Sequence, residues 1–196
     1  MTANYVFWRP LAGDKFCSVG ALLGVPDAFE VTRGVSREGG FPADAHFEMN
    51  PRFPDQVALP DGLVNLDRLV VVSPTLRDFL ADQVLAQLAQ VELLPVTILN
   101  HKRRDSGAPY AIVNPLTIVD VIDVGASSLE WNSIDPTLIC TCDQLVLKDG
   151  GVPGDPLLFR PKFLETRVLL RRDLADAIRA KGFTGISFVE IDAFEA

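Results

Sequence analysis

Histidine and cysteine are scarce in this sequence, and their scarcity excludes several kinds of site. The 196 residues include two histidines, His46 and His101, and three cysteines, Cys17, Cys140 and Cys142. An odd number of irregularly spaced cysteines does not form a disulfide framework. Residues 140 and 142 would place both thiols on one face of a strand, where we expect buried small side chains rather than zinc ligands. We therefore expect no metal and no cofactor.

Sequence patterns of nucleophilic catalysis and of phosphate binding are also absent. No G-x-S-x-G or similar motif surrounds a serine or cysteine, and the glycine-rich segments 20–24 and 150–154 lack the Lys-Ser/Thr of a phosphate loop. The carboxylates of Asp120 and Asp123 are of the type that acts as acid, base or cation ligand. Their spacing predicts opposite faces of a strand, which argues against a shared site. We expect no catalytic residue, and a small carboxylate-dependent enzyme stays as an alternative.

Long apolar runs and a basic surface are missing as well. No run approaches the roughly 20 apolar residues of a membrane span, and the first ten residues lack the basic and apolar regions of a signal peptide. We therefore expect a cytoplasmic protein without a membrane partner. The net charge of −8 disfavours nucleic acid, which needs a basic surface. It suits a basic protein partner, although solubility alone would also explain it.

Apolar side chains make up 48% of the residues, enough for a sizeable core. The stretch Tyr110–Trp131 is rich in Val, Ile and Thr, so it predicts central strands at 110–113 and 117–123. Pro115 lacks a backbone N–H and is expected at a strand start, an edge or a bulge.

Shorter apolar runs predict the remaining strands. They are expected at residues 5–8, 29–32, 69–72, 91–100, 129–131, 138–147, 157–159, 166–170 and 185–191. Because Pro95 interrupts the run at 91–100, we expect that strand to be bulged or to lie at an edge.

Two segments have the apolar spacing of helices. The first, at 74–90, begins with Ser73 as N-cap and Pro74 in the first turn. The second, at 172–181, ends at Gly182, which favours a left-handed cap. Many strands with two main helices, and no regular βαβ alternation, predict an α+β fold with a mixed, mostly antiparallel sheet.

The first 60 residues are rich in turns. We expect residues 1–60 to form a loop-rich N-terminal lobe packed on an α+β core of residues 61–196, in one compact unit. Phe41, Phe47 and Phe53 are expected to fix loops on the core rather than to stack on bases, because Arg52 is the only Arg or Lys interleaved with them, which makes a poor nucleic-acid platform.

Acidic residues gather in the middle of the chain. Between residues 105 and 155 there are eight carboxylates and one basic residue, which gives this segment a net charge of −7. Such a cluster would attract a basic surface on another protein over long range. Five of these carboxylates are predicted as partner-binding residues, namely Glu130, Asp135, Asp143, Asp149 and Asp155.

Several segments, taken in order, resemble a known family. The segments are Val70–Pro74, Glu92–Val96, Tyr110–Asn114, Val119–Asp123, Ser127–Ser128, Leu158–Arg160 and Gly182–Phe188. In this order and spacing, from about Leu69 to Val189, the chain resembles immunity protein family 11 of bacterial polymorphic toxin systems. Residues 1–60 lie largely outside the resemblance, and Arg171 stands where the family pattern would place a short polar helix cap.

The resemblance implies a small cytoplasmic protein without enzymatic activity that binds and neutralises a toxin protein. It says little about which surface binds, so no functional residue is transferred from it. Two alternatives stay open. One is a non-enzymatic structural or regulatory subunit that forms a homo-oligomer, and the other is the small enzyme based on Asp120 or Asp123.

Overall fold

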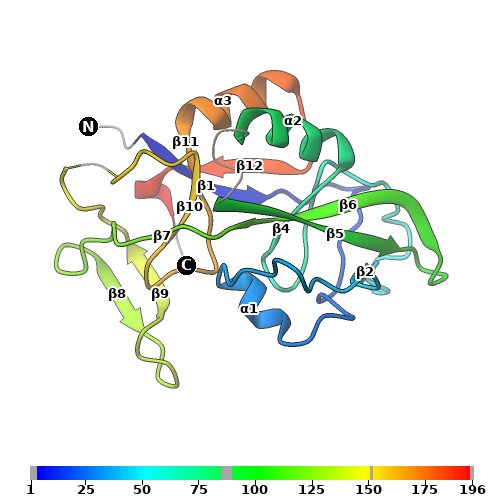
Figure 1. Cartoon of the computed structure of the whole chain (residues 1–196), viewed down its shortest axis with the longest axis horizontal. Coiled ribbons are helices and arrows are strands. Elements are labelled where there is room, and N and C mark those ends of the chain that lie inside the picture. The colour runs from blue at the N-terminus through cyan, green and yellow to red at the C-terminus, as the bar shows by residue number, and fades with distance from the viewer. Residues whose placement is uncertain (1–3, 85–89, 151, 195–196) are drawn as a thin grey trace.

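Two five-stranded sheets form the frame of the computed structural model, which describes residues 4–84, 90–150 and 152–194 (Figure 1). The first sheet contains, from edge to edge, β12 (Ile186–Val189), β1 (Tyr5–Pro10), β11 (Leu169–Arg171), β10 (Leu158–Pro161) and β7 (Ile118–Val119). The second sheet contains β2 (His46–Glu48), β5 (Val91–Leu99), β6 (Asp105–Pro115), β4 (Val70–Val72) and β3 (Gly62–Leu63). The helices are α1 (Ala28–Thr32), α2 (Pro74–Val84), α3 (Arg172–Lys181) and the short 3-10 helix η2 (Ile191–Ala193).

The pairing of the strands is mixed and mostly antiparallel. Only β10 with β7 and β2 with β5 pair in parallel among the described strands of the two sheets. The predicted α+β class is therefore confirmed. The expectation of a single sheet is wrong, because the strands form two five-stranded sheets that share an apolar core and are also joined by a loop contact described below.

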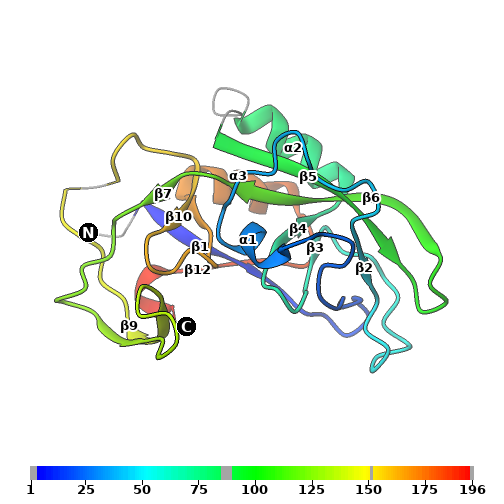
Figure 2. The same ribbon diagram turned by 60° about the horizontal axis from the view of Figure 1, so that its bottom comes forward.

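The strand β6 is the centre of the second sheet. Tyr110 and Ile112 point to one face and Ala111 and Val113 to the other, and all four are buried. The helices α2 and α3 lie side by side over the second of these faces, while α1 lies beyond the first (Figures 1 and 2). Because both faces are covered at this end of the strand, its segment Tyr110–Val113 is an unbroken apolar run in the sequence.

The two prolines occupy different positions in this sheet. Pro115 is the last residue of an interior strand and pairs with Val91. β4 pairs with β6 only at Ala111–Val113, so the other side of Pro115 has no strand partner among the described residues, and the predicted edge position is confirmed locally for Pro115. Pro95 lies on a part of β5 that has no second strand partner among the described residues, because β2 pairs with β5 at Thr97–Leu99. The predicted edge position is thus confirmed locally.

The predicted strand at 117–123 is mostly wrong. Only Ile118–Val119 joins a sheet, as β7 beside β10. Val121 and Ile122 turn inward instead and are buried among the side chains beneath the first sheet. Asp123 then begins a turn, which ends the extended segment.

The segment 29–32 is part of the helix α1 rather than the expected strand. Its last carbonyl groups, those of Val31 and Thr32, accept hydrogen bonds from the guanidinium group of Arg160 at 3.1 and 2.9 Å. A contact with a residue so distant in sequence overrides the strand preference of Phe, Val and Thr, because local propensities are weak.

The two main helices begin and end largely as expected. The N–H of Leu76 donates to the Ser73 hydroxyl at 3.3 Å, which confirms the N-cap of α2. Residues 85–89 of the predicted 74–90 helix lie outside the described residues. Gly182 has a φ of 73°, so the left-handed cap of α3 is confirmed. None of the described helices is long and apolar enough to cross a membrane.

The first 60 residues contribute to both sheets. They supply β1 inside the first sheet and β2 at the edge of the second. Phe47 is fully buried and Phe41 packs against the same core, whereas Phe53 is exposed. The packing role is thus confirmed for two of the three phenylalanines. A folding boundary near residue 60 stays a prediction.

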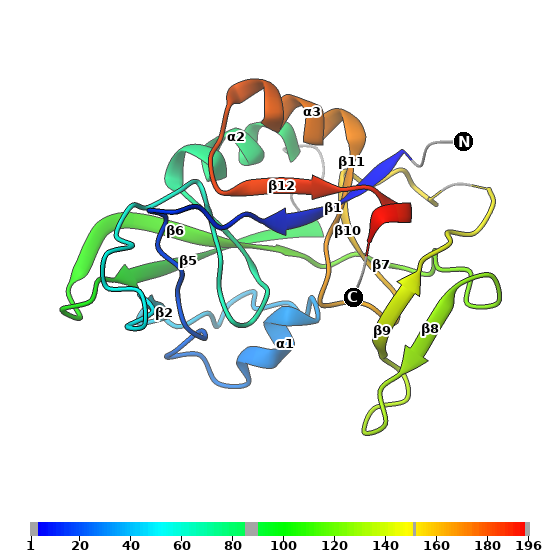
Figure 3. The same ribbon diagram turned by 180° about the vertical axis from the view of Figure 1, so that it is seen from behind.

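The two sheets share the apolar core beneath α2 and α3, and they are also joined where two loops touch. The carboxylate of Asp61 accepts hydrogen bonds from the Thr184 N–H and hydroxyl, and from the Ser73 hydroxyl. The Gly62 N–H donates to the carbonyl of Thr184 at 2.9 Å. Gly185 has a φ of 74°, and its backbone packs directly on that of Gly62. A side chain on Gly185 would be excluded there, so the joint requires glycine. Figure 3, the view from behind, shows β12 beside β1.

Candidate protein-binding surface

A hairpin of two strands, β8 (Ser128–Trp131) and β9 (Ile139–Gln144), extends from one corner of the molecule (Figures 1 and 3). Among the described residues its strands pair with each other and with neither sheet. We call residues 128–144 the projecting hairpin. It carries three of the five predicted partner-binding carboxylates.

The strands of the projecting hairpin are fixed to the core of the first sheet at several points along their length. The Ile139 N–H donates to the Phe163 carbonyl at 2.8 Å. The ring of Trp131 meets the ring of Phe163 edge to face, with 5.4 Å between the centroids. Leu129 and Cys142 pack into the same apolar cluster. These contacts give the hairpin a defined position relative to the sheets.

The tip of the projecting hairpin is ordered by its own side chains. Asn132 Oδ1 accepts hydrogen bonds from the N–H groups of Ile134 and Asp135, at 2.8 and 3.0 Å. The Asp135 carboxylate accepts from the N–H and the hydroxyl of Thr137. Such local bonds fix a turn. The turn presents Ile134 to solvent with 93% of the residue exposed.

The five predicted carboxylates are distributed over the hairpin and the loop that follows it. Glu130 and Asp143 lie on the strands and Asp135 lies at the tip, while Asp149 and Asp155 follow β9. Asp143 and Asp149 are exposed and form no ion pair with a described residue. Their charges are therefore not neutralised by a direct contact in the described part of the chain.

The other carboxylates have contacts within the protein. Glu130 accepts a hydrogen bond from the Thr141 hydroxyl at 2.9 Å. Asp135 lies 3.6 Å from the guanidinium of Arg33, beside the end of α1. The hydrogen bond from Thr137 holds the pKa of Asp135 below its usual value. Asp135 thus shapes the tip and links it to α1.

Asp155 ties its loop to the first sheet. Its carboxylate accepts a hydrogen bond from the Tyr5 hydroxyl at 2.9 Å and pairs with Arg171 at 2.7 Å. Burial raises the pKa of Tyr5, and the hydrogen bond to Asp155 raises it further. Asp155 itself has a φ of 43°, in the left-handed region that Asp tolerates better than most residues. Its side chain therefore has a structural role.

Asp120 and Asp123, the alternative catalytic pair, have separate partners. Asp120 accepts a hydrogen bond from Lys148 at 2.6 Å and lies 3.8 Å from Lys162. The bond from Lys148 lowers the pKa of Asp120. Asp123 accepts from the N–H of Gly125 and of the next residue, which closes a turn. Both carboxylates thus support local structure, and they share no described partner.

The two cysteines of β9 do not lie on one face, so that prediction is wrong. The register shifts between Glu130 and Trp131, which leaves Cys140 as the extra residue of a bulge. Cys140 is therefore exposed, whereas Cys142 is buried in the core. In the described part of the chain no group of three or more His, Cys, Asp or Glu side chains is placed to hold a metal ion.

Sequence reasoning did not single out Ile134. The signal that was available is local: an isoleucine between Ser133 and Asp135-Pro136, in a polar turn between two strands. An isolated apolar residue in such a turn has no neighbours with which to pack, so it reaches solvent unless another molecule covers it.

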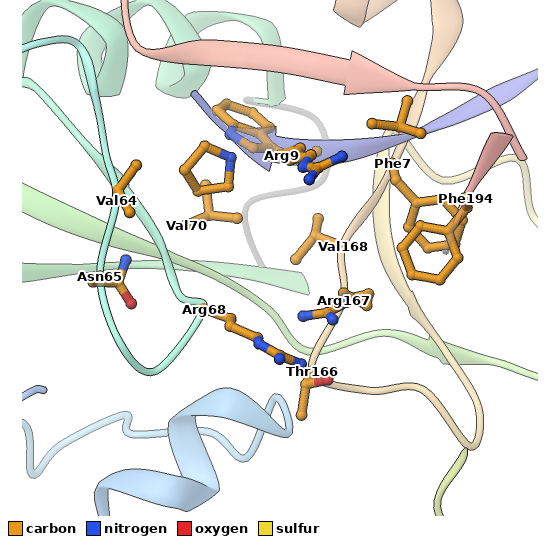
Figure 4. A pocket seen from close by; sticks show the side chains of 13 residues that line it. Phe7, Arg9, Val64, Asn65, Arg68, Val70, Thr166, Arg167, Val168 and Phe194 are labelled. Atoms are coloured by element: carbon orange, nitrogen blue, oxygen red, sulfur yellow. The ribbon is translucent and has the colours of Figure 1, made fainter. Parts of the chain in front are cut away.

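The structure also assembles a cavity that no sequence pattern indicates. It has a volume of about 360 Å³ and lies beside β1, the loop between β3 and β4, and the start of β11 (Figure 4). The side chains of Arg9, Arg68 and Arg167 line it. Because these arginines come from three distant parts of the chain, only the fold brings them together.

Comparison with known proteins adds one finding. The model of a family described as "Immunity protein family (Imm11)" matches residues 21–193. The match reaches further towards the N-terminus than the expected resemblance from Leu69 to Val189. No curated protein matches the chain.

Proposed function

The chain belongs to the Imm11 immunity protein family, and on this premise we propose that it binds and neutralises a toxin protein through the projecting hairpin. The observation that carries the choice of surface is the exposed apolar tip, Ile134, on the same hairpin as Asp143, an exposed carboxylate that forms no ion pair with a described residue. Neutralisation then results from occupying the toxin, with no chemistry performed by this chain.

The apolar part of the projecting hairpin suits the centre of an interface. Ile134 is 93% exposed and Trp131 is 40% exposed, although both are large hydrophobic residues. Residues of this kind contribute most binding energy when a partner removes them from water. The hydrogen bonds of Asn132 and Asp135 order the tip before binding, which reduces the entropy lost on association.

The charged part suits the edge of the same interface. Asp143 lies on the hairpin and Asp149 on the loop that follows, and both are exposed. Exposed carboxylates attract a basic partner over long range and speed its association. The toxin surface that fits this arrangement is basic, with a hollow that accepts Ile134. Asp135 and Asp155 act indirectly, because each holds a segment of this surface in place.

The experiment measures binding to the toxin domain encoded beside this chain. The partner is first recovered by pull-down with tagged protein from the native cells, at low and at high salt. Biolayer interferometry then compares Ile134→Ser with Val57→Ser. Val57 is also exposed and lies in the loop after β2, away from the projecting hairpin. We expect at least about tenfold weaker binding for Ile134→Ser, since a buried isoleucine contributes about 1.5–3 kcal/mol.

Two results would contradict the proposal. Equal affinity of Ile134→Ser and Val57→Ser for the toxin would show that the hairpin tip is outside the interface. Recovery of this chain alone, from cells that express the neighbouring protein, would contradict toxin binding. Light scattering at the same step then tests the homo-oligomer alternative.

A further inference from the structure

The cavity beside β1 has a lining of one charge sign. Its polar side chains are three arginines, Asn65 and Thr166, and no acidic residue is among the described residues that line it. Figure 4 shows the side chains of Arg68 and Arg167 directed towards one another at the lower edge of the cavity, with Arg9 at its upper edge. This is unusual in a chain with a net charge of −8, where a basic surface is not expected by chance.

Each arginine is held by an ordered part of the backbone. Arg9 belongs to β1 and pairs with Ser187 of β12. The Arg167 N–H donates to the Leu164 carbonyl at 3.0 Å. Arg68 lies in the loop that Asn65 closes, through an amide group bonded to the N–H and the carbonyl of Leu69 at 2.9 and 2.7 Å. The backbone at all three arginines is thus fixed before any ligand arrives.

Arg68 has an unusual backbone conformation. Its φ is 59°, in the left-handed region that residues other than glycine, asparagine and aspartate rarely adopt. The Asn65 bonds and a hydrogen bond of 2.6 Å from the Leu22 N–H to the Asp67 carboxylate hold the loop in this form. Strain of this kind occurs at ligand sites because the surrounding structure must maintain it.

The three positive charges are not balanced within the described structure. No ion pair within 4.0 Å joins Arg9, Arg68 or Arg167 to a described carboxylate. Arg167 contacts the ring of Phe194 at 5.8 Å. Burial lowers the pKa of Arg167, and the positive charges of Arg68 and Arg9 lower it further, to about 10. Arg167 therefore stays protonated at neutral pH. An anion in the cavity would relieve this repulsion.

From this arrangement we propose that the cavity binds a phosphorylated small molecule, with its phosphoryl group held by Arg9, Arg68 and Arg167. A phosphoryl or pyrophosphoryl group carries two or more negative charges and has several oxygen acceptors for the forked donors of arginine. A single carboxylate would leave most of the charge and most of the donors unsatisfied. The volume of about 360 Å³ lies within the range of small-molecule sites.

The apolar wall of the cavity accounts for the rest of the ligand. Phe7 and Phe194 stack with 3.9 Å between their centroids, and Val70, Val168 and Val189 complete this wall. A flat or apolar group joined to the phosphoryl group fits such a wall. The site is separate from the projecting hairpin, so this inference does not depend on toxin binding.

The test is isothermal titration calorimetry of the full chain with four probes. Inorganic pyrophosphate and ADP carry the phosphoryl chemistry, adenosine lacks it, and citrate carries similar charge on carboxylates. We expect pyrophosphate and ADP to bind, adenosine to give no heat, and citrate to bind at least about tenfold more weakly than pyrophosphate. Tighter binding of ADP than of pyrophosphate would identify the apolar wall as part of the site. Equal or weaker binding of ADP would show that the wall is not used and would overturn that part of the proposal.

Variants assign the binding to the cavity. Arg9→Gln and Arg68→Asn each remove one guanidinium at an exposed position, and asparagine tolerates the left-handed backbone. Each is expected to weaken pyrophosphate binding about tenfold or more, because a hydrogen bond to a charged group contributes about 1.5–3 kcal/mol. Arg104→Gln, at an exposed arginine outside the cavity, is the control and should leave affinity within about twofold.

Three results would overturn the proposal. The first is the absence of measurable binding of both pyrophosphate and ADP. The second is citrate affinity equal to that of pyrophosphate, which would indicate a general anion site. The third is unchanged affinity in both cavity variants. Circular dichroism spectra of the variants show whether they are folded. If Arg68→Asn is not folded, the affinity of Arg9→Gln alone decides the third result.

Discussion

Arg160 Nη2 donates a hydrogen bond to Asn114 Oδ1, 3.1 Å away and 46 residues distant in sequence. Both residues are buried, with exposures of 2% and 0%. The rest of the guanidinium group donates to the carbonyl oxygens of Val31, Thr32, Pro115 and Glu165. The Asn114 amide donates in turn to the Glu92 carboxylate at 2.9 Å. This network joins α1 to both sheets, and burial lowers the pKa of Arg160 to about 10 without removing its charge at neutral pH.

We expect Arg160→Met to lower the free energy of unfolding by about 3–5 kcal/mol. Methionine fills much of the volume but leaves four carbonyl groups and the Asn114 oxygen without a donor in a buried site. Urea unfolding followed by circular dichroism measures the change. Arg104→Met, at an exposed arginine, should change stability by less than about 0.5 kcal/mol. A decrease in the free energy of unfolding of less than about 1 kcal/mol in Arg160→Met would show that the network contributes little to stability.

Charge reversal at Asp143 and Asp149 is expected to lower the rate of association with the toxin, with a smaller effect on dissociation. Neither carboxylate has a described ion pair, so both act on the partner over long range. Stopped-flow kinetics of Asp143→Lys with Asp149→Lys, at several salt concentrations, should show a slower rate and a weaker salt dependence. Asp55→Lys, in the loop after β2, is the matched control. Identical kinetics in all variants would exclude this acidic surface. Asp155 is left intact, because its reversal would break contacts to Tyr5 and Arg171.

Asp173 should make stability depend on pH below about pH 4. The hydrogen bond from Arg171 holds the pKa of Asp173 below its usual value of 3.8. A carboxyl group with a lowered folded-state pKa stabilises the protein above its unfolded-state pKa, and this contribution is lost as the pH falls through the folded-state value. The difference in unfolding free energy between wild type and Asp173→Asn should therefore be constant from pH 5 to 7, below about 1 kcal/mol, and should shrink at lower pH. Asp82→Asn provides the exposed control. A difference that grows on acidification would contradict the assignment.

Gly185→Ala should destabilise the joint between the two sheets by about 2 kcal/mol or more. A Cβ atom at this position would overlap the Gly62 carbonyl oxygen and the Pro60 ring, and the φ of 74° adds strain. Gly39→Ala is a matched control, since Gly39 also has a positive φ, 79°, but a Cβ there meets nothing within 4 Å. Thermal unfolding of both variants separates the loss of stability caused by steric overlap, expected in Gly185→Ala alone, from the loss caused by a positive φ, expected in both. An equal loss of stability in the two variants would mean that the close contact of the two loops contributes little to the stability of the protein.

Cys140 should be the fast-reacting thiol of the folded protein. It is exposed at the bulge of β9, whereas Cys17 and Cys142 are buried. Burial raises the pKa of Cys17 to about 11 and also raises that of Cys142, so little reactive thiolate is present at either. Titration with Ellman's reagent is expected to give one thiol per chain under native conditions and three in denaturant. Two fast thiols would place Cys142 on the surface and contradict its burial in the core.

Local features of the fold follow from the sequence. The helix start at Ser73 and the left-handed cap at Gly182 each depend on one residue and its immediate neighbours, and both are confirmed. The apolar run of β6 also identifies a buried strand, because that signal likewise depends on neighbouring residues alone. The strand expected at 29–32 fails because Arg160, far along the chain, fixes the carbonyl groups of α1. Contacts of that range leave no local trace in composition or periodicity.

The sequence alone determined the class of this protein: an acidic α+β chain whose ordered segments resemble a family of immunity proteins, a relationship that the family match over residues 21–193 establishes. Only the tertiary structure decided how charge is distributed. It neutralises Asp120 and Asp155 with bases from elsewhere, leaves Asp143 and Asp149 without ion pairs in the described chain, and gathers Arg9, Arg68 and Arg167 around one cavity. The physical reason is that electrostatic interaction depends on distance in space and on burial, and neither quantity can be read from position along the chain.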